Sequence, residues 1–305
     1  MSSNPFIHGG PINKPDGFIG RGHELNQILN RLRDESFSSI SIVGERRIGR
    51  TSLLKILPVQ SVDAHFIYID LQMIEPEDQR LDFWHEVLSQ LENQIADSEV
   101  KAIIKTFRQA GRIKNRFLNR LFGKLDNAGL SIILLLDELE HLADNPNFGP
   151  NFFYGLRSLA LNHRLALVTT SQTELDNLSL SDPKSGASPF FNIFGIVYLG
   201  SFKPEEVDQF FDHYLAGTGI QFTTEERDFL RTIAGLHPYY LTVGGGLLFD
   251  AYLNLPLLRE RSEYVKHYFA AEAKDALRYS WSHTAKVEKI LVLTESVAQK
   301  EIARR

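Results

Sequence analysis

Residues 44–54 read GERRIGRTSLL, which nearly matches the phosphate-binding pattern G-x-x-x-x-G-K-[ST] but has arginine at position 50 in place of lysine. Two glycines allow such a loop to turn its amide hydrogens inward, and the helix that follows points its positive end at the same place. Thr51 offers a hydroxyl to Mg²⁺. The candidate phosphate contacts are Gly44, Glu45, Arg46, Arg47, Ile48, Gly49, Arg50, Thr51 and Ser52.

A second candidate group lies about 90 residues further on, where ILLLDE (133–138) describes a buried strand that ends in two carboxylates. Asp137 is a candidate Mg²⁺ ligand, directly or through water, and Glu138 could orient and deprotonate an attacking water. The alternative interpretation is an ordinary acidic turn. LVTTSQ (167–172) places Thr170 and Ser171 at the tip of another strand, where they would contact a terminal phosphate or simply cap a turn.

The elements that must position these groups follow from apolar runs. Strands are predicted at 39–44, 65–71, 131–140, 164–172 and 195–200, with helices between them, including 21–34, 79–97 and 100–125 with a break near Gly111. This alternation predicts an α/β fold with a five-stranded parallel sheet and helices on both faces. The strand that ends near Ser171 is expected between the loop strand and the carboxylate strand.

After residue 200 only helices are predicted, at 201–215, 223–235, 238–253, 259–278 and 283–302. We therefore expect a domain boundary near residue 200, between a strand-containing part at 21–200, preceded by an N-terminal lead-in at 1–20, and an all-helical second part.

Composition narrows the class of protein. The chain has 305 residues, 43 % of them apolar, with a net charge of -5, and no run is apolar enough to span a bilayer. It has no Cys, and none of its ten His lie four residues apart, so a thiolate or His-based metal site is not expected. The N-terminus carries no signal pattern, and a cytoplasmic location is expected.

A charge contrast allows two interpretations. Residues 101–124 hold eight Lys or Arg and no acid, whereas 75–99 hold eight Asp or Glu and one Arg. Two solvated helices could face each other electrostatically. Alternatively, the basic stretch could contact nucleic acid or a partner.

Six stretches in this order resemble the STAND class of P-loop ATPases, near the archaeal-type ATPases and the AAA+ initiators. They are FIGRGHEL (18–25), GERRIGRTSLL, LLLDELEHL (134–142), FFYGLRSLA (152–160), SPFFNIFGIVYLG (188–200) and GLHPYYL (235–241). The resemblance implies an ASCE/AAA+-like P-loop NTPase domain at 21–200, a helical lid domain at 201–278 and the start of a winged-helix-like region at 279–305 that ends early. The rest of that region, with a sensor or effector module, would follow residue 305 or come from a separate chain. It also implies ATP or ADP and Mg²⁺ as ligands.

The resemblance assigns further residues. Ile19, Gly20 and Arg21 would line the adenine side, and His237 and Pro238 would reach the nucleotide from the lid. Arg157 would form a salt bridge or act on a neighbouring subunit. Gln172 stands where relatives often have Arg, which leaves no charged phosphate sensor there.

The function that the resemblance implies is a switch, closed with ADP and self-associating with ATP, in signalling or defence. Arg is longer than Lys and forked, so Arg50 should preserve weakened binding but slow hydrolysis, in which Glu138 and Arg50 are the candidate catalytic residues. Two alternatives stay open. One is a DNA-associated, initiator- or transposition-like ATPase, and the other is a scaffold that binds nucleotide without hydrolysing it.

Overall fold

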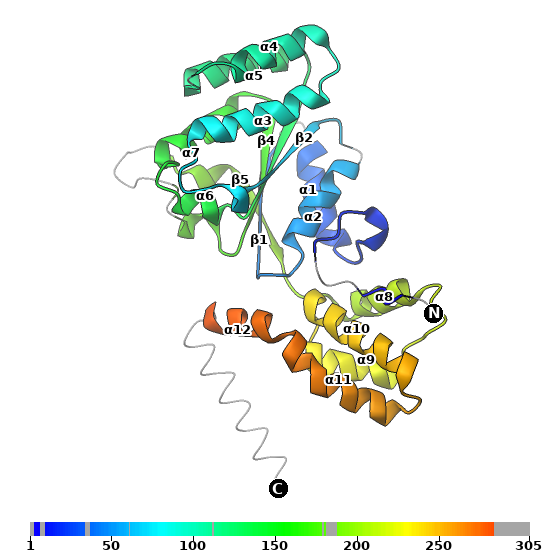
Figure 1. Cartoon of the computed structure of the whole chain (residues 1–305). Coiled ribbons are helices and arrows are strands. Elements are labelled where there is room, and N and C mark those ends of the chain that lie inside the picture. Colours follow the sequence, from blue (N-terminus) through cyan, green and yellow to red (C-terminus); the bar gives the residue numbers. More distant parts are fainter. Residues whose placement is uncertain are drawn as a thin grey trace. The chain divides into compact units, whose positions relative to one another are not determined.

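The computed structural model describes residues 3–6, 10–33, 37–60, 62–111, 113–178, 180 and 188–283. The chain divides into two compact units, one comprising Pro11–Gly200 and the other Met1–Gly10 together with Ser201–Arg305. The first unit contains the sheet, and the second is built from helices (Figure 1).

The sheet has five parallel strands in the spatial order β2-β3-β4-β1-β5. The strands are β1 (Ser39–Gly44), β2 (His65–Asp70), β3 (Ile132–Asp137), β4 (Leu165–Ser171) and β5 (Phe194–Leu199). The predicted five-stranded parallel sheet is confirmed, and β4 separates β1 from β3 as expected. Because the carboxyl ends of parallel strands meet at one edge, the residues that follow β1, β3 and β4 are brought together.

Helices cover both faces of this sheet. Along β3, Leu134 packs in one apolar cluster and Leu135 in the other, because successive side chains of a strand point to opposite faces. The first cluster includes residues of α3, α5 and α7, and the second includes residues of α1 and α2. The helices of this unit are α1 (Gly22–Arg33), α2 (Arg50–Ile56), α3 (Arg80–Gln94), α4 (Ser98–Arg108), α5 (Asn115–Asn127), α6 (Glu140–Asp144) and α7 (Pro150–Asn162).

The second unit is helical in its described part, as predicted. Its helices are α8 (Pro204–Leu215), α9 (Thr224–Ala234), α10 (Pro238–Asn254), α11 (Leu258–Glu272) and α12 (Lys274–His283). Phe6 from the N-terminal segment stacks on Tyr214 and Phe222, with ring centroids 5.3 and 5.9 Å apart. This packing explains why the first ten residues belong with the helices.

The predicted helix break and the predicted C-terminal helices have different outcomes. The expected break near Gly111 corresponds to the interval between α4 and α5. Two predictions concern the C-terminal end: a helix at 283–302 and a winged-helix-like start at 279–305. Their residues beyond His283 lie outside the described part of the chain. No helix in the described part of the chain has both the length and the apolar character needed to cross a bilayer.

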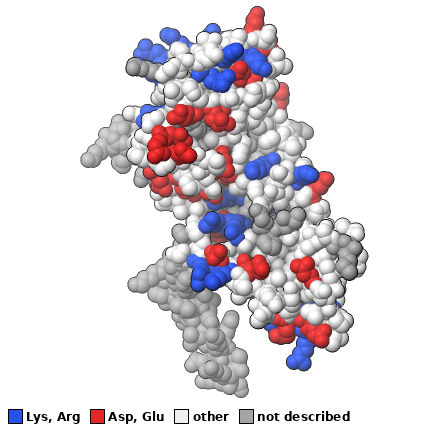
Figure 2. Space-filling view, viewed as in Figure 1, with Lys and Arg blue, Asp and Glu red and all other residues white. Residues whose placement is uncertain are grey.

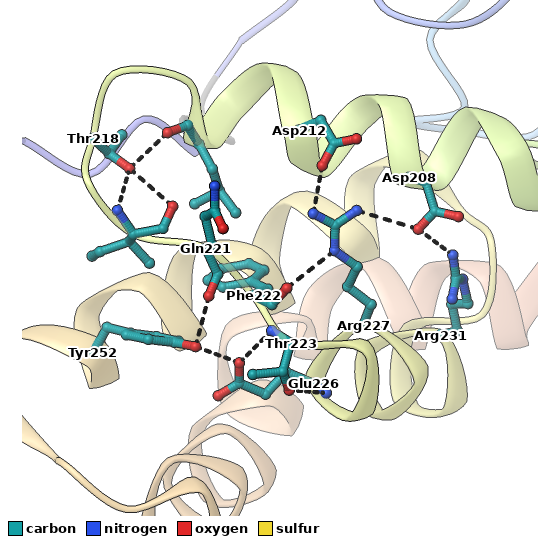
Figure 3. Close-up of polar contacts among 12 residues, drawn as sticks. Asp208, Asp212, Thr218, Gln221, Phe222, Thr223, Glu226, Arg227, Arg231 and Tyr252 are labelled. Atoms are coloured by element: carbon teal, nitrogen blue, oxygen red, sulfur yellow. Dashed lines mark hydrogen bonds and ion pairs between the residues drawn. The ribbon is translucent and has the colours of Figure 1, made fainter.

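A buried carboxylate connects three helices of the helical unit, and Figure 3 shows its hydrogen bonds with Tyr252 and Thr223. Glu226 is fully buried and accepts hydrogen bonds from Arg261 Nε at 2.9 Å, from the hydroxyl of Tyr252 and from the backbone amide of Thr223. The last of these belongs to a capping box, since Thr223 Oγ1 accepts from the amide of Glu226. Glu226 therefore ties α9 to α10 and α11.

Replacing Glu226 with Gln is expected to lower the free energy of unfolding of this unit by about 3 kcal/mol, because the guanidinium of Arg261 would stay buried without a counter-charge. Thermal or urea denaturation measures the change. Asp228→Asn is the matched control. Its carboxylate pairs with Arg231 but is 64 % exposed, so the loss should stay below about 1 kcal/mol. Equal losses for the two variants would contradict this account.

Candidate functional site

The loop between β1 and α2 has the backbone that phosphate binding requires. A side chain at Gly44 would place its Cβ 2.6 Å from the carbonyl oxygen of Leu199, so only glycine allows β1 to end this close to the strand beside it. Gly49 adopts a φ of 107° immediately before α2 begins at Arg50. Ile48 is buried and anchors the loop, whereas the side chains of residues 45–47 are exposed. The first amides of α2, which have no partner within the helix, face the loop.

Arg50 lies at the centre of this site and is only 4 % exposed. Its Nη2 atom is 3.5 Å from Oε1 of Glu138, and its Nη1 atom is 3.8 Å from Oε1 of Glu140. These ion pairs join α2 to the carboxyl end of β3, so the loop and the carboxylates lie at the same edge of the sheet. Nη1 nevertheless has no hydrogen-bond partner among the described residues. A buried donor without an acceptor is costly, and an oxyanion would satisfy it.

Asp137 is held by two hydroxyls. Thr170 Oγ1, at the end of β4, donates to one carboxylate oxygen at 2.5 Å, and the hydroxyl of Tyr68, on β2, donates to the other at 2.9 Å. Burial, together with the negative charge of Asp137, raises the pKa of the Tyr68 hydroxyl, which therefore remains a donor at physiological pH. Asp137 is 3 % exposed. It is thus a fixed carboxylate of the kind that orients a metal ion.

Glu138 adopts a left-handed backbone conformation directly after β3, with a φ of 59°. Its amide donates a hydrogen bond to Thr170 Oγ1 at 2.8 Å. Its carboxylate accepts a hydrogen bond from the side-chain amide of Gln72 and lies 3.4 Å from Nε2 of His141. Positive φ at a residue other than glycine costs energy and often occurs at functional sites. Among the described residues there are four such positions, and Arg21, Arg47 and Glu138 belong to this site, whereas Phe37 does not.

The structure also brings the opening motif to the loop. Arg21 has a φ of 63°, is 3 % exposed, and donates from Nη2 to the carbonyl of Ile48 at 3.2 Å. It also pairs with Glu24 at 3.5 Å. Ile19 and Gly20 directly precede it and are partly buried. These residues therefore lie next to the phosphate loop.

Other candidates have internal partners. Ser52 accepts a hydrogen bond from the amide of Ile12 at 3.0 Å, Thr51 is partly buried in the first turn of α2, and Ser171 donates to the carbonyl of Thr173 at 2.6 Å. Arg157, for which a salt bridge was one of two interpretations, forms no ion pair with any residue in the described ranges. His237 and Pro238 form the start of α10 in the helical unit, so their contact with a nucleotide stays a prediction.

Three residues at this site were not predicted from the sequence. Tyr68 and Gln72 come from β2 and the turn after it, and Glu140 accepts the amide of Gln172 while facing Arg50. The strand order offers a signal, since polar residues that follow β2 must reach the same edge as those that follow β3. Glu140 could have been found from its position two residues after Glu138.

The donor set fits a magnesium–phosphate ligand. No group of three or more His, Asp or Glu side chains in the described residues is arranged to hold a metal ion without help. Mg²⁺ usually keeps one or two protein ligands and takes the rest from phosphates and water. Thr51 and Asp137 are the residues that would supply those ligands.

Replacing Tyr68 with Phe is expected to weaken Mg²⁺-dependent ATP binding by about 10-fold, because Asp137 loses one of the two donors that orient it. ADP affinity measured without Mg²⁺ should hardly change. Titration calorimetry in the two conditions makes the comparison. Tyr198→Phe is the control, since that hydroxyl is bonded to Glu174 on the exposed edge strand. Equal affinities for wild type and Tyr68→Phe in Mg²⁺ would exclude this role.

Comparisons with known proteins identify the family and the fold of this chain. Residues 34–298 match the family described as Novel STAND NTPase 2. The Walker-type ATPase PABY2304 of Pyrococcus abyssi superposes with a TM-score of 0.61 at 18 % identity, covering 91 % of this chain and 78 % of that one. ORC2 of Aeropyrum pernix, solved in complexes with ADPNP and ADP, gives 0.60 at 14 % identity and covers 87 % and 71 %.

A third solved structure is domain III of the Thermotoga maritima replication initiation protein DnaA, with a TM-score of 0.52 at 16 % identity, covering 85 % of this chain and 99 % of that one. At such identities the likeness concerns the fold, which is that of an α/β P-loop NTPase with a helical C-terminal part, as predicted. No curated protein sequence matches this chain.

Proposed function

Because the chain belongs to the Novel STAND NTPase 2 family, we propose that it binds ATP and ADP with Mg²⁺ at the loop between β1 and α2 and hydrolyses ATP slowly. The observation that carries the proposal is the buried guanidinium of Arg50. It faces the loop and two carboxylates, and one of its nitrogens lacks an acceptor. A phosphate oxygen supplies that acceptor.

The roles of the residues follow from their positions. The loop from Gly44 to Ser52 surrounds the phosphates, Thr51 and Asp137 hold Mg²⁺, and Glu138 deprotonates the attacking water. Arg21, with Ile19 and Gly20, lies on the adenine side. Ser171 contacts the terminal phosphate, and His237 and Pro238 approach from the helical unit. The structures of ORC2 with ADPNP and ADP support this nucleotide class.

Slow turnover follows from the same contacts. Arg50 is paired with the proposed base, Glu138, at 3.5 Å. While this pair persists, the carboxylate faces the guanidinium and not an attacking water. Phosphate must also compete with Glu138 and Glu140 for the same cation. The nucleotide state then controls self-association or an effector, on the same chain or a separate one, and the cysteine-free composition agrees with a cytoplasmic location.

The test uses the full chain. Nucleotide released on denaturation is identified by chromatography, and ATP and ADP binding to stripped protein is measured by equilibrium dialysis with and without Mg²⁺. We expect binding of both nucleotides, with ATP affinity raised by Mg²⁺ and lowered by Thr51→Ala but not by the control Thr106→Ala on α4. If the protein releases no nucleotide on denaturation and takes up no Mg-ATP, the proposal is refuted.

A further inference from the structure

The two helices α4 and α5 form a basic hairpin whose charge the protein does not neutralise. Figure 2 shows Lys and Arg side chains gathered over these helices at the top of the view. Six of them are exposed: Lys101, Lys105, Lys114, Arg116, Arg120 and Lys124. None of these six forms an ion pair with a residue in the described ranges, and only Arg108 pairs, with Glu92 on α3 at 2.9 Å. The facing acidic helix therefore compensates one cation.

The cations follow the solvent side of each helix. On α4, Lys101 and Lys105 lie four residues apart, and on α5 the same spacing relates Arg116, Arg120 and Lys124. Like charges at this spacing destabilise a helix. The opposite sides are apolar and buried, with Ile104 on α4 and Leu118, Leu121, Phe122 and Leu125 on α5. The rows of basic side chains on the solvent side therefore lower the stability of the helices, and the packing of the apolar sides does not require them.

Acidic groups on the two helices themselves are few. Glu99 lies in the first turn of α4, beside Asp97, which caps that helix. Asp126 at the end of α5 is engaged by His163 at 2.5 Å and by the amide of Arg164. The basic face consequently carries a local positive charge on a chain whose net charge is -5. A polyanion is the complementary partner.

The apolar side chains on this face help to decide which polyanion it would bind: an acidic protein, a membrane, a single strand or a duplex. None of the exposed large apolar side chains of the described chain lies between residues 98 and 127. Protein interfaces and membrane-bound helices need apolar anchors, and single-stranded nucleic acids need exposed aromatic rings for stacking. Charge without any of these suits the phosphate backbone of a duplex, which carries one charge per about 1.7 Å of its axis.

We propose that the basic hairpin formed by α4 and α5 is a docking surface for the phosphate backbone of double-stranded nucleic acid, without preference for sequence. The hairpin lies at the opposite end of its unit from the β1–α2 loop (Figure 1). Duplex binding therefore leaves the nucleotide site open. The two proposals are independent and can fail separately.

The test is fluorescence anisotropy with a labelled 20-bp duplex of mixed sequence and the full chain, between 50 and 200 mM salt. Six phosphate contacts predict that the logarithm of the association constant falls with the logarithm of the salt concentration with a slope of about -5. The triple variant Lys105→Glu, Arg116→Glu, Arg120→Glu should lose at least about 100-fold in affinity at 50 mM salt. Circular dichroism melting should show a protein at least as stable as wild type, and ATP binding, measured on the same protein, should match wild type.

The matched control is Lys203→Glu, Arg259→Glu, Lys274→Glu, which changes the net charge equally at exposed positions of the helical unit. It should keep nearly all the duplex affinity. The proposal is overturned by absence of duplex binding at 50 mM salt or by equal losses in both triple variants. Tighter binding of poly-glutamate or of phosphatidylserine vesicles than of duplex would also overturn it and would identify an acidic protein or a membrane instead.

Discussion

Replacing Arg50 with Lys is expected to raise the rate of ATP hydrolysis by about 100-fold, because a misplacement near 1 Å at a reacting centre costs about that factor. The longer guanidinium reaches Glu138 and Glu140. A lysine ammonium is a compact point charge that cannot pair with two carboxylates in the same way. The substitution should therefore place the charge at the phosphates and free the base.

Formation of ADP in quenched single-turnover experiments with Mg-ATP measures this change, since it reports chemistry without product release. The control is Arg116→Lys, which makes the same exchange at an exposed position of α5, outside the loop. An unchanged or lower rate for Arg50→Lys would show that arginine is the better catalytic residue at this position. The explanation for slow turnover would then be wrong.

The second large effect concerns Glu138. In the Arg50→Lys background, which gives measurable turnover, Glu138→Gln should lower the hydrolysis rate by about 100- to 10,000-fold, the range expected for a general base. ATP affinity should change little, since glutamine keeps the size of the side chain and its position beside Gln72 and His141. The variant should accumulate bound, uncleaved ATP.

Rapid filtration followed by chromatography of the bound nucleotide distinguishes ATP from ADP. Asp144→Asn removes an exposed carboxylate at the end of α6 and serves as the control. Should Glu138→Gln cleave ATP as fast as its parent, another group must activate the water. Glu140 is then the next residue to test, because it faces Arg50 from the same turn.

The sheet was predictable because its strands are almost uninterrupted apolar runs. β3 and β4 are buried at every position, so each reads as a central strand of a parallel sheet, covered on both faces. The order of the motifs along the chain also predicted that β4 separates β1 from β3. Gly111 predicted the break between α4 and α5, because the helical pattern loses its apolar positions there.

The internal partners of the site were not predictable. Thr170 was considered as a phosphate contact, whereas its hydroxyl accepts from the amide of Glu138 and donates to Asp137. Tyr68 was seen only as part of a strand. Which hydroxyl reaches which carboxylate depends on the register of neighbouring strands and on side-chain rotamers. Single-sequence patterns determine neither.

For Arg50, the sequence predicted the position and the charge of the side chain but not its contacts. The pattern identified its position and its charge, and the loss of lysine predicted altered chemistry. The sequence did not indicate that the guanidinium would be buried between two carboxylates, because this depends on the turn after β3. That turn needs the left-handed conformation of Glu138, which no local signal predicts for a glutamate.

The most direct test of the central claim is a crystal structure of the full chain with Mg²⁺ and a non-hydrolysable ATP analogue. The account predicts phosphate oxygens within hydrogen-bond distance of the amides from Arg47 to Thr51, with Mg²⁺ between Thr51 and Asp137. Arg50 should have left Glu138 for a phosphate. An analogue bound elsewhere, or an Arg50 that stays paired with both carboxylates while phosphate occupies the loop, would contradict it.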